Sequence, residues 1–112
     1  MLQIEQVITV ENLKEAVTVW EKNRKYKLLA AGTDLIPRIR SGAYQEAVCL
    51  LDISRVAELK GITKTEDEIR IGALTSHQEI AENEVIRKEY RALAQACGQV
   101  GSLQIRNTAT IG

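Results

Sequence analysis

Cysteine and histidine are scarce in this chain of 112 residues, which has two cysteines and one histidine. Cys49 and Cys97 lie far apart in the sequence, which is typical of reduced thiols in the core of a cytosolic protein. His77 and these separated cysteines lack the spacing of a zinc or iron–sulfur ligand set. We therefore expect no metal chemistry within this chain.

An excess of charge of either sign is also missing, because 15 basic residues balance 15 acidic residues. A balanced chain has no broad attraction to nucleic acid or to an anionic membrane. The sequence has neither an apolar run of about 18 residues nor a charged-then-apolar leader, so we expect a soluble, cytoplasmic protein. Hydrophobic residues make up 45% of the chain, which is enough for the core of one small domain.

Small residues are concentrated directly after an apolar, strand-like stretch at residues 26–30. Ala31 and Gly32 follow it, and then the polar residues Thr33 and Asp34. So little side-chain bulk lets a ligand approach the backbone, where several N–H groups are expected to be free. The pattern predicts a strand that runs into a tight turn.

A short helix is expected after this turn, over residues 35–41. Asp34 stands at the position of an N-cap, and Pro37 falls in the first turn, where its missing N–H costs little. Strand, small-residue turn and helix start together are typical of a cradle for phosphate. An ordinary strand-to-helix connection has the same pattern, so this stretch alone leaves both interpretations open.

The first half of the chain alternates strands and helices. An extended segment is expected at residues 2–10 and a buried strand at residues 47–51, which are continuously apolar. Asn12 is an N-cap with Glu15 three residues on, and the helix that it opens is expected to end near residues 23–25. Its apolar residues at helical spacing are Leu13, Ala16, Val17 and Trp20. This order favours a small parallel sheet.

A β-hairpin is predicted by two alternating stretches, residues 61–64 and 68–71. We expect it to give the fold a mixed sheet. Before the hairpin, Ser54 is a candidate cap for a single helical turn that runs through Leu59.

Capped helices are predicted in the last third of the chain. Ser76 and Glu79 form a capping box, Asn83 caps a further turn, and residues 90–97 have apolar positions at helical spacing. The last of these helices is expected to end at two glycines, Gly98 and Gly101. Residues 102–107 are then expected to form a turn. The junctions near residues 32, 75 and 110 all combine glycine, alanine and threonine, which suggests that they converge on one large ligand.

Four motifs, in order along nearly the whole chain, resemble one known family. They are residues 29–35, 51–54 with 58–62, 71–77, and 104–112. In these motifs the chain is similar to the FAD-binding subunit of the molybdenum hydroxylases, a family that includes bacterial xanthine dehydrogenase and carbon monoxide dehydrogenase. The resemblance implies an α/β (α+β) fold of the PCMH or vanillyl-alcohol-oxidase type, in which a small parallel or mixed sheet has flanking helices. Residues 1–112 would form one domain, the N-terminal part of a FAD-binding domain. Within it, residues 1–55 would be a βαβαβ unit with the pyrophosphate loop. Residues 56–112 would contain the hairpin, the helices and the start of the second flavin-contacting motif.

The resemblance also implies which residues bind FAD. Those implied along the diphosphate and adjoining ribose are Lys27, Leu28, Leu29, Ala30, Ala31, Gly32, Thr33 and Asp34, with Gly32, Thr33 and Asp34 closest. Those implied on the flavin side are Ala109, Thr110, Ile111 and Gly112, with Leu74 and Thr75 flanking the cofactor. Backbone N–H groups suit a diphosphate because they are preorganised donors that need no buried cation.

The function implied by the resemblance is electron transfer without catalytic side chains. FAD would accept electrons from [2Fe–2S] clusters on an iron–sulfur subunit and pass them to NAD or another acceptor, with substrate oxidised on a molybdopterin-binding subunit. The family loop usually has two glycines where this chain has Ala31 and Gly32, so Ala31 must have a negative φ. The family motif continues beyond Gly112 with a glycine, an asparagine and further subdomains. We therefore expect a fragment, a truncated gene product or the ordered part of a larger protein, which alone completes no reaction.

Two alternatives remain open at this point. One is a non-catalytic α/β interaction module or fragment that binds no flavin. The other is a flavin oxidase of the same fold without a molybdenum partner. Single side chains have simpler interpretations as well: Trp20 as a core or rim aromatic, His77 as an exposed residue, and Lys27, Arg38 and Arg40 as solvated cations that could also steer a diphosphate.

Overall fold

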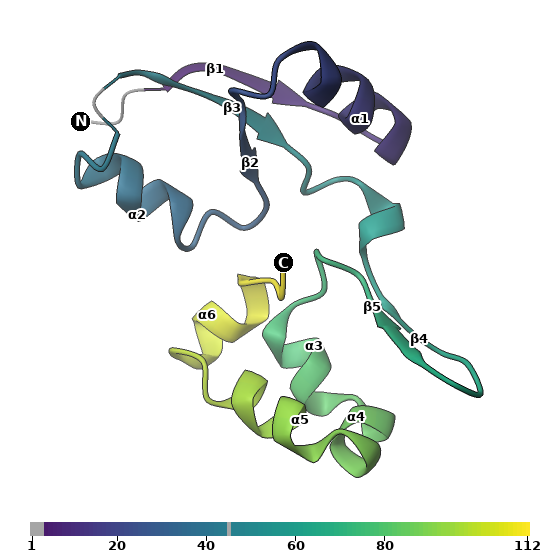
Figure 1. Cartoon of the computed structure of the whole chain (residues 1–112). Coiled ribbons are helices and arrows are strands. Elements are labelled where there is room, and N and C mark those ends of the chain that lie inside the picture. The colour runs from purple at the N-terminus through teal and green to yellow at the C-terminus, as the bar shows by residue number, and fades with distance from the viewer. Residues whose placement is uncertain (1–3, 45) are drawn as a thin grey trace. The chain divides into compact units, whose positions relative to one another are not determined.

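The computed structural model describes residues 4–44 and 46–112, and the chain divides into two units, Met1–Glu58 and Leu59–Gly112. The first unit contains a three-stranded parallel sheet of β1 (Ile4–Thr9), β2 (Lys27–Leu29) and β3 (Val48–Asp52), in the order β1-β3-β2 (Figure 1). The predicted parallel sheet is confirmed. Of the extended segment expected at residues 2–10, residues 1–3 lie outside the described part.

Strand β3 is the centre of this sheet and the most buried element of the unit. Leu50 and Leu51 are each 1% exposed, and successive side chains of a strand face opposite sides of the sheet. Both faces of β3 are therefore covered, which explains why its sequence is a continuous apolar run. Cys49, which directly precedes Leu50, is only partly buried, so the expectation that it is a core residue is wrong. Its partial burial and the nearby Glu5 carboxylate both raise the pKa of the thiol.

Two helices accompany the sheet, α1 (Leu13–Lys22) and α2 (Leu35–Arg40). The Asn12 cap is confirmed, because its Oδ1 accepts a hydrogen bond from the Glu15 N–H at 2.9 Å. One core cluster of this unit joins α2 to the sheet through Ile39, Val48 and Leu50. Trp20 is partly buried, in keeping with a position at the rim of the core.

Two predicted caps in this unit are wrong. Asp34 precedes α2 but has helical backbone angles, φ −108° and ψ −48°, and its side chain makes no capping hydrogen bond. An N-cap side chain reaches the first-turn N–H groups from an extended backbone, which Asp34 lacks. Ser54 does not cap the 3₁₀ turn η1 (Ala57–Leu59), because its hydroxyl donates instead to Asp52 Oδ1 at 2.6 Å.

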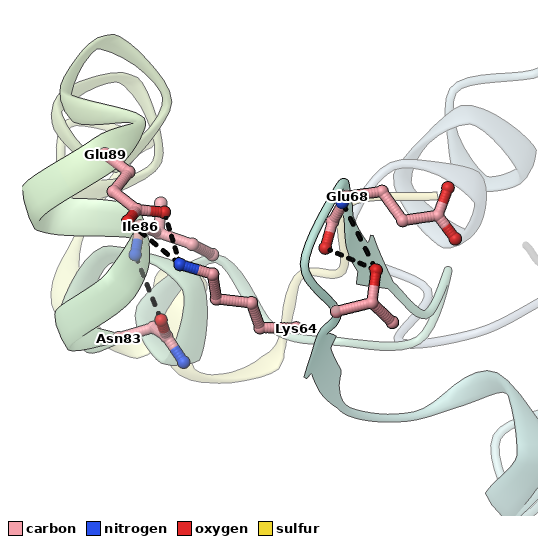
Figure 2. A network of polar contacts seen from close by, with 6 residues as sticks. Lys64, Glu68, Asn83, Ile86 and Glu89 are labelled. Carbon is pink, nitrogen blue, oxygen red and sulfur yellow. Dashed lines mark hydrogen bonds and ion pairs between the residues drawn. The ribbon is translucent and has the colours of Figure 1, made fainter.

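The second unit begins with the predicted hairpin, β4 (Ile62–Lys64) paired antiparallel with β5 (Ile69–Ile71). It forms a two-stranded sheet of its own, so the expectation that it joins a mixed sheet is wrong. Its apolar face packs on helices instead: Ile62, Ile69 and Ile71 contact a buried cluster of Ile80, Ile86, Ala94 and Cys97. Lys64 Nζ also ties the hairpin to a helix, at 2.9 and 2.8 Å from the carboxylate oxygens of Glu89 (Figure 2).

Four helices complete this unit: α3 (His77–Glu82), α4 (Glu84–Glu89), α5 (Arg91–Gly98) and α6 (Leu103–Thr108). The caps at Ser76 and Asn83 are confirmed, with hydrogen bonds from the N–H groups of Glu79 at 3.1 Å and Ile86 at 3.1 Å. Cys97 is buried, as predicted. As predicted, α5 ends at Gly98, which is its last residue, and Gly101, with φ +49°, lies beyond the helix.

Helix α6 was not predicted, since residues 102–107 read as a turn. Ser102 caps the helix by accepting from the Ile105 N–H at 3.3 Å. Leu103 and Ile105 are 52% and 39% exposed and stand two residues apart, so they show no helical periodicity. No helix in the described part of the chain is long and apolar enough to cross a membrane.

Candidate functional site

The first candidate region is the glycine loop, which we define as residues 30–34. It follows the carboxyl end of β2, an edge strand of the parallel sheet, and leads into α2. Carboxyl ends of parallel strands are where α/β sheets usually bind ligands. The loop is anchored at both sides, because Leu29 O accepts from the Ile53 N–H at 3.0 Å and Gly32 O accepts from the Ile36 N–H at 3.1 Å.

The backbone of the glycine loop has donors without partners. No residue in the described ranges accepts a hydrogen bond from the N–H groups of Ala31, Gly32, Thr33 or Asp34. Ala31, Thr33 and Asp34 are exposed, so water or a ligand satisfies these donors. Free N–H groups next to a helix start are suited to an anion.

Gly32 is required by the geometry of the loop. Its φ is +81°, and a Cβ at this position would lie 3.0 Å from Ile36 Cγ1 and 3.2 Å from Leu29 Cδ1. Ala31 is compatible with its position, because no non-glycine residue among those described has a positive φ. The departure from two glycines therefore leaves the backbone of the loop unstrained.

Two cations of the first unit, Lys27 of β2 and Arg38 of α2, lie near the ring of Tyr44. Lys27 Nζ is 5.2 Å and Arg38 Cζ 5.8 Å from the centre of the Tyr44 ring, within the range of cation–π attraction. Arg38 also pairs with Asp34 at 3.7 Å, and both side chains are largely exposed. Pairs of this kind contribute at most about 1 kcal/mol. Of the other predicted residues, Leu28 is exposed, whereas Leu29 and Ala30 are partly buried.

The second candidate region consists of the paired segments, which we define as residues 72–76 and 109–112. Ile111 N–H donates to Thr75 O at 3.0 Å, and Gly112 N–H donates to Ala73 O at 2.9 Å. Thr110 forms an antiparallel bridge with Ser76, and His77 N–H donates to Ala109 O at 3.0 Å. The structure thus brings the predicted residues Leu74 and Thr75 together with Ala109, Thr110, Ile111 and Gly112.

Thr75 holds the paired segments in place. It is fully buried, its Oγ1 donates to Gly61 O at 3.1 Å, and the same oxygen accepts from the Gly61 N–H at 3.0 Å. Because both hydrogen bonds go to Gly61, the hydroxyl of Thr75 is committed within the unit. Any contact that Thr75 makes with a ligand therefore comes from its backbone.

Two glycines allow close backbone approach in the paired segments. A Cβ on Gly72 would clash with the backbone carbonyl of Leu59, and a Cβ on Gly112 would lie 2.6 Å from the Cβ of Ala73. Neither Gly72 nor Gly61 was predicted to be an anchor. The two glycines flank the hairpin, and this position could have indicated their role, since glycine there often marks a close approach of another backbone segment.

Arg106 is a further residue whose role the sequence did not show. Its Nε donates to Gln78 Oε1 at 3.1 Å, and its Nη1 lies 3.4 and 3.3 Å from the carbonyl oxygens of Val100 and Gly101. These bonds hold α6 against α3 and so position residues 109–112. Nearby, His77 is half-buried, and its Nδ1 is buried without a partner among the described residues, so the expectation that His77 is exposed is wrong.

Two of the three small-residue junctions therefore meet, those near residues 75 and 110, both within the second unit. The junction near residue 32 belongs to the first unit. Convergence of all three on one ligand stays a prediction.

Comparison with known proteins gives a consistent result. The family described as "FAD binding domain in molybdopterin dehydrogenase" matches residues 2–112. The nicotinate dehydrogenase FAD-subunit of Eubacterium barkeri is 41% identical over 85 residues, 76% of this chain and 28% of the relative. The xanthine dehydrogenase FAD-binding subunit of Escherichia coli O157:H7 is 36% identical over 103 residues, 89% of this chain and 34% of the relative.

Solved structures give the same fold. The carbon monoxide dehydrogenase of Hydrogenophaga pseudoflava, in a form that lacks the Mo-pyranopterin moiety of the molybdenum cofactor, matches with a TM-score of 0.91 and 27% identity. The match covers 100% of this chain and 39% of that one, so the chain spans well under half the length of the relatives that it matches. The α/β fold class is confirmed, and FAD is the cofactor of the family. This chain belongs to the family of FAD-binding domains of molybdopterin dehydrogenases.

Proposed function

We propose that this chain binds FAD non-covalently through the glycine loop and the paired segments, as the flavin-binding part of a molybdenum hydroxylase-type dehydrogenase. The observation that carries the proposal is the glycine loop, where four consecutive N–H groups, those of residues 31–34, have no acceptor among the described residues. Family membership over residues 2–112 gives the ligand that would use them. The two units would then be parts of one FAD-binding domain.

The residues present fit FAD in both regions. In the glycine loop, residues 27–34 would line the diphosphate and adjoining ribose, with the donors of Gly32, Thr33 and Asp34 closest. In the paired segments, residues 109–112 would contact the flavin side, with Leu74 and Thr75 flanking it. Gly112 and Ala73 pack so closely that a side chain on Gly112 would not fit, which leaves backbone as the contact surface there.

FAD held by residues 27–34 and 109–112 would supply the redox chemistry, which is electron transfer from the [2Fe–2S] clusters of an iron–sulfur subunit to NAD or to another acceptor. The residues of this chain bind and orient the cofactor and act as neither acid nor base. Substrate would be oxidised on a molybdopterin-binding subunit of the same complex, in the cytoplasm. The chain alone would complete no turnover.

The test is equilibrium binding of FAD to the 112-residue chain, followed by quenching of flavin fluorescence, with ADP and AMP as competitors. We expect the chain to bind FAD, and we expect ADP but not AMP to compete for this binding. Only ADP carries the diphosphate that the loop donors would hold. Circular dichroism would establish that the chain is folded. Failure of the folded chain to bind FAD would contradict the proposal.

A further inference from the structure

A cleft of about 580 Å³ opens among α3, α4 and α5 of the second unit. Its least exposed lining residues are Ala81 and Ala94, whose small side chains leave the space between the helices unfilled. The remaining lining residues include Arg87, Lys88 and Arg91, all exposed. We call this space, with these five residues, the basic cleft.

The cations of the basic cleft have no acidic partner. No ion pair involves Arg87, Lys88 or Arg91 among the residues that the structure describes. Glu89, which lies between them in the sequence, is bound to Lys64 of the hairpin instead (Figure 2). Glu84 is the one acidic residue in the lining, so three positive charges face one negative charge.

Arg91 stands where a cation is electrostatically unfavourable. It is the first residue of α5, a helix that has no acidic residue in its first turn and no side-chain cap, because Tyr90 provides none. Helix N-termini carry partial positive charge, which repels a cation at this position. Arg87 and Lys88 lie instead in the last turn of α4, where the helix dipole favours cations. A negatively charged occupant would relieve the repulsion at Arg91.

We propose that the basic cleft docks an acidic segment of a partner protein, an extended stretch rich in aspartate and glutamate. Charge complementarity selects an anionic occupant. A protein segment fits better than a small anion because the three cations are exposed, whereas small-molecule sites use buried, fixed polar groups to orient their ligand. Exposed charges at a docking surface mainly speed association and select partners. The proposal does not depend on the binding of FAD.

The test measures binding of a fluorescein-labelled polyglutamate peptide to the 112-residue chain by fluorescence anisotropy. The variant Arg87→Gln/Lys88→Gln/Arg91→Gln removes the three cations, and Lys14→Gln/Lys22→Gln/Arg24→Gln removes three exposed cations from the first unit as the matched control. We expect the first variant to bind about tenfold more weakly or worse, and the control to bind like the unaltered chain. Binding should also weaken as ionic strength rises.

A second variant distinguishes a loss of peptide affinity from a loss of folding. Arg91→Glu places a favourable charge at the start of α5, so the helix should be at least as stable by circular dichroism while peptide affinity falls. Equal losses in the cleft variant and the control, or full affinity in Arg91→Glu, would overturn the proposal. Displacement of the peptide by inorganic pyrophosphate at matched total charge would overturn it too, because a small anion would then suffice.

Discussion

The glycine loop and the paired segments use their backbone N–H groups in opposite ways. Residues 31–34 donate to no described residue, whereas Leu74, Thr75, Ile111 and Gly112 all donate to carbonyl groups of their own unit. The first region therefore keeps donors available for a ligand, and the second uses its donors to hold a shape. We infer that the glycine loop contributes most of the affinity for a diphosphate. We propose that the paired segments contribute a surface of small residues against which the cofactor would lie.

The largest expected effect tests the rigidity of the paired segments. Gly72→Ala places a methyl group against the backbone carbonyl of Leu59, with 2.6 Å to the carbonyl carbon, and backbone does not yield as a flexible side chain does. We expect the second unit to lose about 3 kcal/mol of stability. Amide hydrogen exchange across residues 59–112 measures this loss. The control is Gly98→Ala, whose methyl would meet only the Cβ of Ala81 at 3.7 Å and should leave the unit as stable or up to about 1 kcal/mol more stable. Equal stability of the two variants would contradict this account.

The next effect separates the hydroxyl of Thr75 from its backbone. Thr75→Val keeps the shape but leaves the N–H of Gly61 without its partner, whereas Gly61 O keeps the hydrogen bond from the Gly72 N–H at 2.9 Å. The second unit should therefore lose about 2 kcal/mol, measured in the same way. Thr75→Ser keeps the hydroxyl and should lose less. Affinity for FAD, measured on folded protein, should be the same in both variants. A selective loss of FAD affinity in Thr75→Val would show that the hydroxyl reaches the cofactor.

Gly32→Ala tests the donors of the glycine loop. A left-handed backbone costs a non-glycine residue about 1–2 kcal/mol, so stability falls modestly, and the displaced N–H groups should weaken FAD binding by about tenfold or more. Gly42→Ala is a matched control, because Gly42 has φ +80° and open space around it. It should show a somewhat smaller loss of stability, because only the backbone strain applies there, with unchanged FAD affinity by fluorescence quenching. Similar FAD affinities in the two variants would contradict the assignment of the glycine loop to the FAD site.

Asp34→Ala should have the smallest effect. Its carboxylate caps nothing, and its pair with Arg38 at 3.7 Å is exposed to solvent. We expect the free energy of unfolding to change by less than about 0.5 kcal/mol in chemical denaturation. A loss above about 1 kcal/mol would mean that the carboxylate caps α2 in solution after all.

Much of the fold was predictable because the decisive partners are close in sequence. Asn12, Ser76 and Asn83 each cap a helix through an N–H three residues away. The same rule placed a cap at Asp34, where the backbone angles make it wrong. Helix α6 has a cap of this kind at Ser102, but its apolar residues are exposed and therefore unpatterned.

For the candidate site, the sequence by itself determined the family, the small residues of the loops and the buried strand β3, because these depend on residue type and short-range order. Only the tertiary structure decided that Thr75 commits its hydroxyl to Gly61, that Gly72 touches Leu59, and that the segment at residues 109–112 pairs with residues 72–76. These contacts join residues that are between 13 and more than 30 positions apart. These glycine and threonine partners could not be predicted from hydrophobic periodicity. Glycine acts here through its lack of a side chain and threonine through its hydrogen bonds, and neither property produces a periodic pattern.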